Sequence, residues 1–395
     1  MSDVGTSVLR TLNTATVLDA LGKAYRPLRI AELQALSRLT RPTVAQAVEE
    51  LQLAGLVIEG EPDGQPRRGR PASVFQIAPG ARPVVGIDLG PHHVKVLVMD
   101  LGGRIMGESI RPVPAPRDAV SLLDQLPPTI TEALNAAEVT SDTVVRVVTG
   151  SPGVIDPVNG RPTFVPSVAG WSSVDLPGRI GATFSCPTTF ENDANLAAVA
   201  ATMTWPDTTL LAIQWGERLG AGLVIGGRLH RGVNGAAGEI GLINVWDDGP
   251  IVGEHGRGVL EERISGSGVV ARAVHLDPNA APYPSSVTAV FNAGLAGDPR
   301  ALTLIHEVAD DFVRSIAPVV LAVDPQLVVV GGGVARAGDL LLEPIRDLLA
   351  HRTLRTPEVV VSPWADRTVV RGAVELARTQ AWTSVLETIR KTSAR

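Results

Sequence analysis

The stretch LLAIQWGERLGAGLVIGGRLHRGVNGAAGEIG, residues 210–241, decides how the rest of the chain is interpreted. Residues 210–215 and 220–225 are apolar runs of strand length, and Gly226 and Gly227 follow where a two-residue hairpin turn requires positive φ. Further glycines leave one end of this hairpin without side-chain bulk, so a backbone or a ligand can approach closely. Glycine content alone predicts either a tight bend of the sheet or a phosphate-binding loop.

The second half of the stretch, RGVNGAAGEIG at 231–241, holds one carboxylate, Glu239, in a run of small residues. Three shorter motifs accompany it: GSPGVID at 150–156, GW at 170–171 and FENDAN at 190–195. Together these motifs resemble the signature of the ROK family, a group of sugar kinases and sugar-responsive repressors built on the actin-like ATPase fold. The resemblance implies an α/β body of two lobes.

The composition is that of a globular protein of two or three compact units, with 395 residues, 45% hydrophobic and 19% charged. No apolar run is long enough to cross a membrane, and the first 30 residues lack the apolar core of a signal peptide, so we expect a cytoplasmic protein. Cys186 is the only cysteine, which excludes an intrachain disulfide and a multi-cysteine zinc site. The net charge is −6, and the acidic excess lies after residue 80.

We expect three units along the chain. Residues 1–80 are predicted to form a winged helix-turn-helix that binds DNA, and residues 83–195 the first α/β lobe of the actin-like body. Residues 196–367 are predicted to form the second α/β lobe, with the ligand and oligomer contacts. A C-terminal helix within 368–395 is expected to return and complete the first lobe, as the resemblance to the ROK family implies.

The front unit has the spacing of three short helices. Apolar residues at helical spacing predict a helix over 7–24, and a second over 30–37 with Leu33 and Leu36 turned inward. Thr40 before Arg-Pro-Thr is typical of an N-cap followed by a first turn that tolerates proline. Two helices joined by a tight turn predict a helix-turn-helix.

The third helix is expected to read DNA. Val44, Val48 and Leu51 form a buried stripe, which leaves polar donors near the N-terminus of the helix exposed. The residues predicted to contact the duplex from this helix are Thr40, Arg41, Thr43 and Gln46.

A wing is predicted after the third helix. Strands over 56–59 and 73–77 flank a loop in which Arg67, Arg68 and Arg70 lie within four residues, suited to phosphate contacts and to a minor groove. The alternative for such a charge cluster is a solvated turn.

The same front unit resembles the N-terminal domain of ROK repressors, through LTRPTV at 39–44 and RRGRP at 67–71. Two residues depart from that pattern. Arg29 stands where the second helix usually has a serine N-cap, and Arg38 stands where the turn usually has glycine. A left-handed Arg38 costs on the order of 1 kcal/mol.

Both phosphate loops depart from the kinase pattern. Where ROK kinases read DIGGTK, this chain reads DLGPHH at 88–93, and Pro91 removes one backbone donor. Where the kinases read GTGIG, it reads GERLG at 216–220, and Glu217 places a negative charge beside a triphosphate. The adenosine-side motif survives in residues 324–334, although a buried strand and glycine turn also serve the fold there. We therefore expect no ATP turnover and no cofactor.

The resemblance also implies a sugar pocket lined by Asn192, Asp193, Glu239 and Glu261, with Asp193 at the position of the kinases' general base. The alternative for Asp193 is to cap a helix over 194–202. Leu242 replaces the family's sugar- and zinc-binding histidine. The segment 251–259 has no cysteine and only His255, so we expect no zinc.

These observations predict a DNA-binding transcriptional regulator, a dimeric or tetrameric repressor that binds double-stranded operator DNA and senses a sugar or sugar derivative. One alternative is a sugar kinase with an N-terminal regulatory domain, which the altered phosphate loops disfavour. Another is a constitutive DNA-binding protein whose body serves only oligomerisation, which the missing pocket histidine leaves open.

Overall fold

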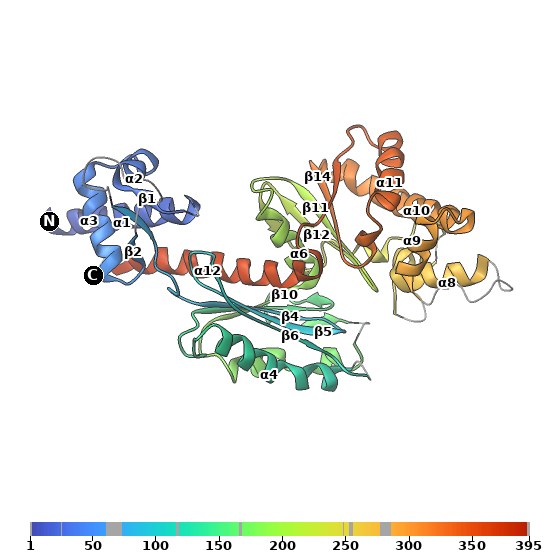
Figure 1. The fold of residues 1–395 in the computed structure, drawn as a ribbon, viewed down its shortest axis with the longest axis horizontal. Helices are drawn as coiled ribbons and strands as arrows, with labels where there is room; N and C mark the ends of the chain where they lie inside the picture. The colour runs from blue at the N-terminus through green and yellow to red at the C-terminus, as the bar shows by residue number, and fades with distance from the viewer. Residues whose placement is uncertain are drawn as a thin grey trace.

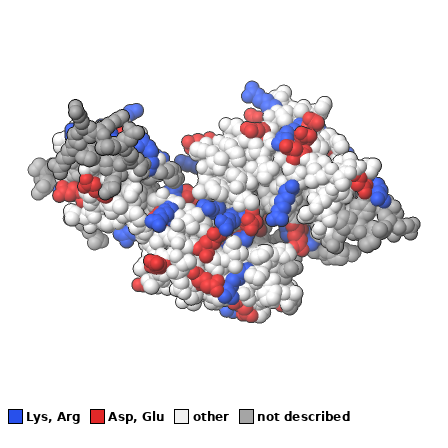
Figure 2. All heavy atoms as spheres, in the orientation of Figure 1, with Lys and Arg blue, Asp and Glu red and all other residues white. Residues whose placement is uncertain are grey.

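The computed structural model describes residues 2–24, 26–60, 73–115, 118–165, 168–247, 249–252, 256–276 and 286–392. An N-terminal unit, a first lobe and a second lobe follow one another in space, and the last helix, α12, runs from the lobes to the N-terminal unit (Figure 1). Charged side chains of both signs are interleaved on the face that Figure 2 shows. Within the described ranges, no helix is both long and apolar enough to cross a bilayer.

The N-terminal unit consists of three helices and a small antiparallel sheet in the order β1-β3-β2. Its core is an apolar cluster in which Val44, Val48 and Leu51 of the third helix are fully buried, as predicted. The elements are α1 (Ser2–Ala24), β1 (Leu28–Arg29), α2 (Ile30–Ser37), α3 (Arg41–Leu53), β2 (Val57–Gly60) and β3 (Val74–Ile77).

The second helix has the predicted bounds, but one of its two core residues was predicted wrongly. Leu33 is buried, whereas Leu36 is 58% exposed, because α2 contacts α1 and α3 on one side only. At its start, the backbone N–H of Arg29 donates to the Glu32 carboxylate at 2.9 Å. This bond is the main reason that the pKa of Glu32 lies below its usual value, and it satisfies the helix start without a serine.

In the turn between α2 and α3, Arg38 has a φ of 59° and so lies in the left-handed region, which costs on the order of 1 kcal/mol. Thr40 is the N-cap of α3, as predicted. Its hydroxyl meets the Thr43 hydroxyl at 2.8 Å and makes no cap bond to a backbone N–H. The helix start therefore depends on backbone geometry and on the proline in the first turn.

The first lobe is built on a five-stranded sheet in the order β10-β7-β4-β5-β6, in which β4, β7 and β10 are parallel. Helix α4 covers one face and α12 the other (Figure 1). Buried Trp171 donates its indole N–H to the Ser151 hydroxyl at 2.8 Å. The elements are β4 (Val84–Leu89), β5 (His93–Met99), β6 (Ile105–Pro112), α4 (Ala119–Ala136), β7 (Arg146–Ser151), β8 (Val154–Ile155), β9 (Pro162–Phe164), η1 (Trp171–Ser173), α5 (Leu176–Gly181), β10 (Thr188–Asn192) and α6 (Asp193–Thr202).

The second lobe repeats this plan with the sheet order β13-β12-β11-β14-β15. The predicted glycine turn joins β12 to β13, with φ of 54° at Gly226 and 76° at Gly227. Trp215 stacks on Phe312 at 4.6 Å between ring centroids, and its indole N–H donates to the Ile264 carbonyl at 2.7 Å.

The elements of this lobe and the last helix are β11 (Leu210–Trp215), β12 (Leu219–Ile225), β13 (Arg228–His230), η2 (Ile240–Leu242), α7 (Val259–Ile264), α8 (Gly266–Leu276), α9 (Val287–Leu295), α10 (Pro299–Val323), β14 (Leu327–Gly331), η3 (Val334–Ala337), α11 (Asp339–Arg352), β15 (Glu358–Val361), η4 (Ala365–Arg367) and α12 (Thr368–Thr392).

Helix α12 touches all three parts of the molecule. Its 25 residues span about 37 Å at 1.5 Å per residue. At one end it lies against α6, where a Cβ on Gly372 would be 1.8 Å from the Leu196 carbonyl oxygen. At the other end Trp382 lies so close to α1 that a Cβ on Gly22 would be 2.3 Å from its ring. The predicted boundary at residue 195 falls inside α6, which packs on both β11 and α12.

Candidate ligand pocket between the two lobes

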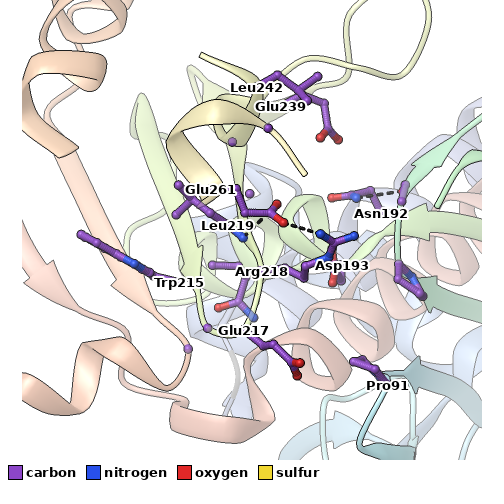
Figure 3. Close-up of a pocket in the computed structure, with 18 of the residues that line it drawn as sticks. Pro91, Asn192, Asp193, Trp215, Glu217, Arg218, Leu219, Glu239, Leu242 and Glu261 are labelled. Atoms are coloured by element: carbon purple, nitrogen blue, oxygen red, sulfur yellow. Dashed lines mark hydrogen bonds and ion pairs between the residues drawn. The ribbon is translucent and has the colours of Figure 1, made fainter. Parts of the chain in front are cut away.

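A cavity of about 210 Å³ lies between the lobes, and the four predicted pocket residues Asn192, Asp193, Glu239 and Glu261 all line it (Figure 3). The first lobe supplies the end of β10 and the start of α6. The second lobe supplies the segment before η2, the β11–β12 loop and α7. The structure therefore brings together residues that are up to 69 positions apart in the sequence.

Asn192, and not Asp193, is the N-cap of α6. Its side-chain oxygen accepts from the backbone N–H groups of Ala194 at 2.8 Å and Asn195 at 3.1 Å, and its amide nitrogen donates to the Gly153 carbonyl at 2.9 Å. The alternative that Asp193 is the cap is wrong, since Asp193 is the first residue inside the helix. Asn192 thus serves mainly to hold the pocket wall.

Asp193 combines a local role with a place in the pocket. Its carboxylate accepts from the Ala194 N–H at 2.8 Å and lines the cavity. The N-terminus of a helix stabilises a negative charge. Nevertheless, burial raises the pKa of Asp193 to about 6, partly offset by the helix N–H groups and by the charge of Arg218.

Glu261 forms an ion pair with Arg218 inside the cavity, and Arg218 lies between Glu261 and Asp193 in Figure 3. Arg257 lies 4.0 Å from the same carboxylate. Sequence reasoning missed this pair, because its partners are 43 positions apart. The feature of the sequence that could have indicated the pair is Arg218 itself, an arginine in a loop where the family has small residues.

Glu239 has the most perturbed carboxyl group that lines the cavity. Burial, followed by the charges of Asp193 and Glu261, raises its pKa to about 7. The structure gives this side chain no hydrogen bond or ion pair within the described part of the chain. An ionised Glu239 is therefore an acceptor that lacks a donor.

Other polar groups extend this acceptor-rich wall. The side-chain oxygen of Gln214, at the end of β11, is buried and has no partner in the described structure. Behind Asp193, burial raises the pKa of Asp88 on β4 to about 6, although Lys95 lies 3.8 Å away. The cleft therefore favours ligands that bring hydrogen-bond donors or positive charge.

In each of the two loops that correspond to phosphate loops, one backbone N–H donates within the loop. The Gly90 N–H donates to the His93 carbonyl at 3.0 Å, and the Gly216 N–H donates to the Arg218 carbonyl at 2.9 Å. Pro91 has no N–H. Across the cleft, His92 of the first lobe contacts the Glu217 carboxylate of the second. The loops thus contact each other where the family kinases bind phosphate.

A second interlobe ion pair was also missed from the sequence. The Arg231 guanidinium donates to Glu191 at 2.5 Å, and Glu191 is 4% exposed. The other oxygen of Glu191 accepts from the Asn195 amide at 2.9 Å. This pair holds the glycine-rich segment after β13 against β10.

The zinc implied by the family resemblance does not fit the residues present. Leu242 lines the pocket with an aliphatic side chain. Cys186, the single cysteine, follows α5 in the first lobe. His255 lies outside the described residues, and among the described ones no three His, Cys, Asp or Glu side chains are arranged to hold a metal.

The predicted DNA contacts lie far from this pocket. Arg41 and Gln46 are exposed on α3 and Thr43 is half-buried. Arg10 of α1 pairs with Glu50 of α3, which fixes the angle between these helices. The three wing arginines, Arg67, Arg68 and Arg70, lie outside the described residues.

A sequence model of the ROK family matches residues 84–380. The chain belongs to the ROK family. The two sheets, with their covering helices and the cleft between them, are the actin-like body of that family.

This ROK chain is similar to proteins of two kinds. It is 26% identical over 377 residues to the putative xylose repressor of Caldicellulosiruptor sp. (strain Rt8B.4), covering 91% of this chain and 93% of the relative. It also resembles a ROK family glucokinase from Streptomyces griseus solved with glucose and AMPPNP, at 25% identity and a TM-score of 0.64, over 75% of this chain and 99% of the other. A ROK family transcriptional regulator, described as a homolog of the E. coli MLC protein, shares the fold over 97% of this chain and 99% of its own, at 21% identity and a TM-score of 0.76.

Proposed function

We propose that this ROK protein is a DNA-binding transcriptional regulator, a homo-oligomeric repressor that releases operator DNA when a small polyhydroxy ligand binds between its lobes. Residues 1–80 act as a winged helix-turn-helix, with α3 in the major groove. The ATP-dependent chemistry of the family kinases is lost.

The observation that carries this proposal is the exposed N-terminal end of α3. Arg41 and Gln46 are exposed there, beside a tight α2–α3 turn and followed by the β2–β3 hairpin. Helices placed in this way present side chains to base edges. The match to a glucokinase covers 75% of this chain, whereas the match to a putative xylose repressor covers 91% of it. The ROK family model begins at residue 84, after this N-terminal unit.

Helix α12 connects the pocket wall with the DNA-binding unit. Helix α6 begins at Asp193 in the pocket and contacts α12 at Gly372, where the two backbones touch. The other end of α12 contacts α1 through Trp382. A ligand that moves the start of α6 therefore biases the position of the DNA-binding unit, provided that it binds the two lobe arrangements differently.

Duplex binding is tested with sequences enriched by the wild-type protein from a random pool. We expect Arg41→Ala to weaken binding by about 1 to 3 kcal/mol, and Arg70→Ala to weaken it while lowering the salt dependence by about one ion. Arg179→Ala, an exposed arginine on α5, is the matched control and should change neither. Equal affinity of the wild type for enriched and random duplexes contradicts the proposal.

A sugar kinase with an N-terminal regulatory domain remains the second candidate, because Asp193 is kept in the pocket at the position of the kinases' base. A coupled assay with ATP across hexoses and amino sugars separates the two. We expect no turnover above an Asp193→Asn control, because Glu217 lines the cavity where a triphosphate would lie and one backbone N–H of each loop already donates within the loop. Sugar-dependent turnover in wild type alone identifies a kinase.

Sensing is tested by operator release, followed by fluorescence anisotropy. Asp193→Ala and Glu239→Ala should bind the operator with wild-type affinity, because both residues lie in the cleft and not on α3. Both should lose the response to a ligand that releases wild type. Equal release from all three proteins shows that the pocket is not the sensor, and no release by any ligand favours a constitutive regulator.

A further inference from the structure

We propose that the pocket selects a positively charged amino sugar, a monosaccharide-sized polyol with one ammonium group, over neutral or phosphorylated sugars. The inference rests on the proposed function, since it takes the interlobe cleft as the sensor. It adds the charge of the ligand, which neither the family nor the relatives specify.

The first argument is the balance of donors and acceptors. The side-chain acceptors of the residues that line the cavity include the carboxylates of Asp193, Glu239 and Glu261. The principal side-chain donor is Arg218, and it is already paired with Glu261. A ligand that brings acceptors, such as a phosphate, finds few partners here. One that brings N–H and O–H groups finds several.

The second argument is charge. Arg218 neutralises one carboxylate, Glu261, and leaves Asp193 and Glu239 facing the cavity. Glu217 also lines the cavity, and His92 contacts its carboxylate. A phosphate would face these groups at low dielectric, where repulsion is strong, whereas an ammonium group would be attracted to all of them.

The third argument is the state of Glu239. Its carboxylate is directed into the cavity in Figure 3 and has no donor among the described residues, so an ammonium group would supply the missing partner. Burial raises the pKa values of Glu239 and Asp193 to about 7 and about 6, although the charge of Arg218 lowers both. The cavity of about 210 Å³ suits a ligand smaller than a drug-sized molecule.

The test compares matched ligand pairs by calorimetry on the full-length protein. The pairs are glucose and glucosamine, galactose and galactosamine, and mannose and mannosamine, each with the N-acetylated amine and the hexose 6-phosphate. At pH 7 we expect at least one amino sugar to bind about 10-fold or more tightly than its neutral partner. Acetylation of the amine removes the charge but keeps the ring, so it should abolish the gain in affinity over the neutral sugar. The hexose 6-phosphate should bind no more tightly than the hexose.

The pH dependence gives an independent readout. Arg218 and Glu261 act on both Glu239 and Asp193, and the charge of Asp193 also acts on Glu239 and on Asp88. Around these groups, Lys95 lies near Asp88, His92 contacts Glu217, and Arg257 lies near Glu261. A sugar ammonium stays charged between pH 7 and 5.5, whereas the two carboxylates take up protons as the pH falls through about 7 and about 6. Amino-sugar affinity should therefore fall by about 10-fold over this range, and neutral-sugar affinity should not follow it.

Two variants test whether Glu239 is responsible for the preference for the amino sugar. Glu239→Gln should bring the affinity of the amino sugar down to that of its neutral partner, and Glu343→Gln, at an exposed site on α11, should keep the wild-type preference. The inference is overturned if every neutral hexose binds as tightly as its amine, if the preference survives Glu239→Gln, or if no sugar binds. If a neutral sugar releases the operator and amino sugars bind no more tightly, the preference for an amino sugar is overturned but the proposed sensor role is not. If an amino sugar binds without releasing the operator, the sensor role in the proposed function is overturned.

Discussion

Replacing Glu239 by glutamine should make the unliganded protein more stable at pH 8 and should have a much smaller effect at pH 5. Burial and neighbouring negative charges raise the pKa of this carboxyl from 4.5 to about 7 in the folded protein. A raised carboxyl pKa means that the folded state favours the protonated form. The stability associated with this group is therefore present below pH 4.5 and is lost as the pH rises through about 7.

The magnitude follows from the size of that rise. At about 1.4 kcal/mol per pKa unit, the full effect is about 3 kcal/mol at alkaline pH. Because Glu239 retains some contact with solvent, screening reduces this to about 1 to 2 kcal/mol. Glutamine has a similar shape and no charge, so the variant should not lose this stability between pH 5 and pH 8.

Urea denaturation at pH 5, 6, 7 and 8, followed by tryptophan fluorescence, measures the difference between variant and wild type. The difference should grow from about 0.3 to 0.5 kcal/mol at pH 5 to about 1 to 2 kcal/mol at pH 8. Glu343→Gln, an exposed position on α11, should show no such growth. If Glu239→Gln and wild type lose stability in parallel over this range, the argument from burial at this site is refuted.

Two further predictions concern packing around α6. Gly372→Ala should destabilise the protein by about 1 to 3 kcal/mol in urea, because its Cβ would lie 1.8 Å from the Leu196 carbonyl oxygen. Gly181→Ala is the control and should be nearly neutral, because there is open space around Gly181. Equal effects of the two substitutions would disprove the close contact at Gly372. Asn192→Ala should cost about 1 to 2 kcal/mol in thermal or urea unfolding, because the cap bonds to the Ala194 and Asn195 N–H groups and the bond to the Gly153 carbonyl are lost, although Ala194 keeps its bond to Asp193. An unchanged midpoint would show that the cap is dispensable.

The sequence predicted the elements whose signal is local. The helix over 30–37 has the predicted bounds, Gly226 and Gly227 form the expected turn, and Thr40 ends the turn before α3. Hydrophobic periodicity, turn glycines and caps depend on neighbours within a few residues, so they can be read from the chain itself.

The resemblance of the motifs to the ROK family also predicted the family and the four pocket residues. Asn192, Asp193, Glu239 and Glu261 do line one cavity. The sequence could not assign their individual roles, and it left open whether Asp193 caps α6. The cap is Asn192, because the backbone of β10 enters the helix one residue earlier than the alternative required.

Only the tertiary structure decided the electrostatics of the cleft. The pairs Arg218 with Glu261 and His92 with Glu217 join segments that are distant in the chain, and no local pattern links them. The same holds for Leu36, exposed because α2 packs on one side only, and for α12, which reaches both the pocket wall and α1. The pKa values of buried carboxyls depend on which charges and how much water surround them, and this is fixed by the packing of the two lobes rather than by the order of residues.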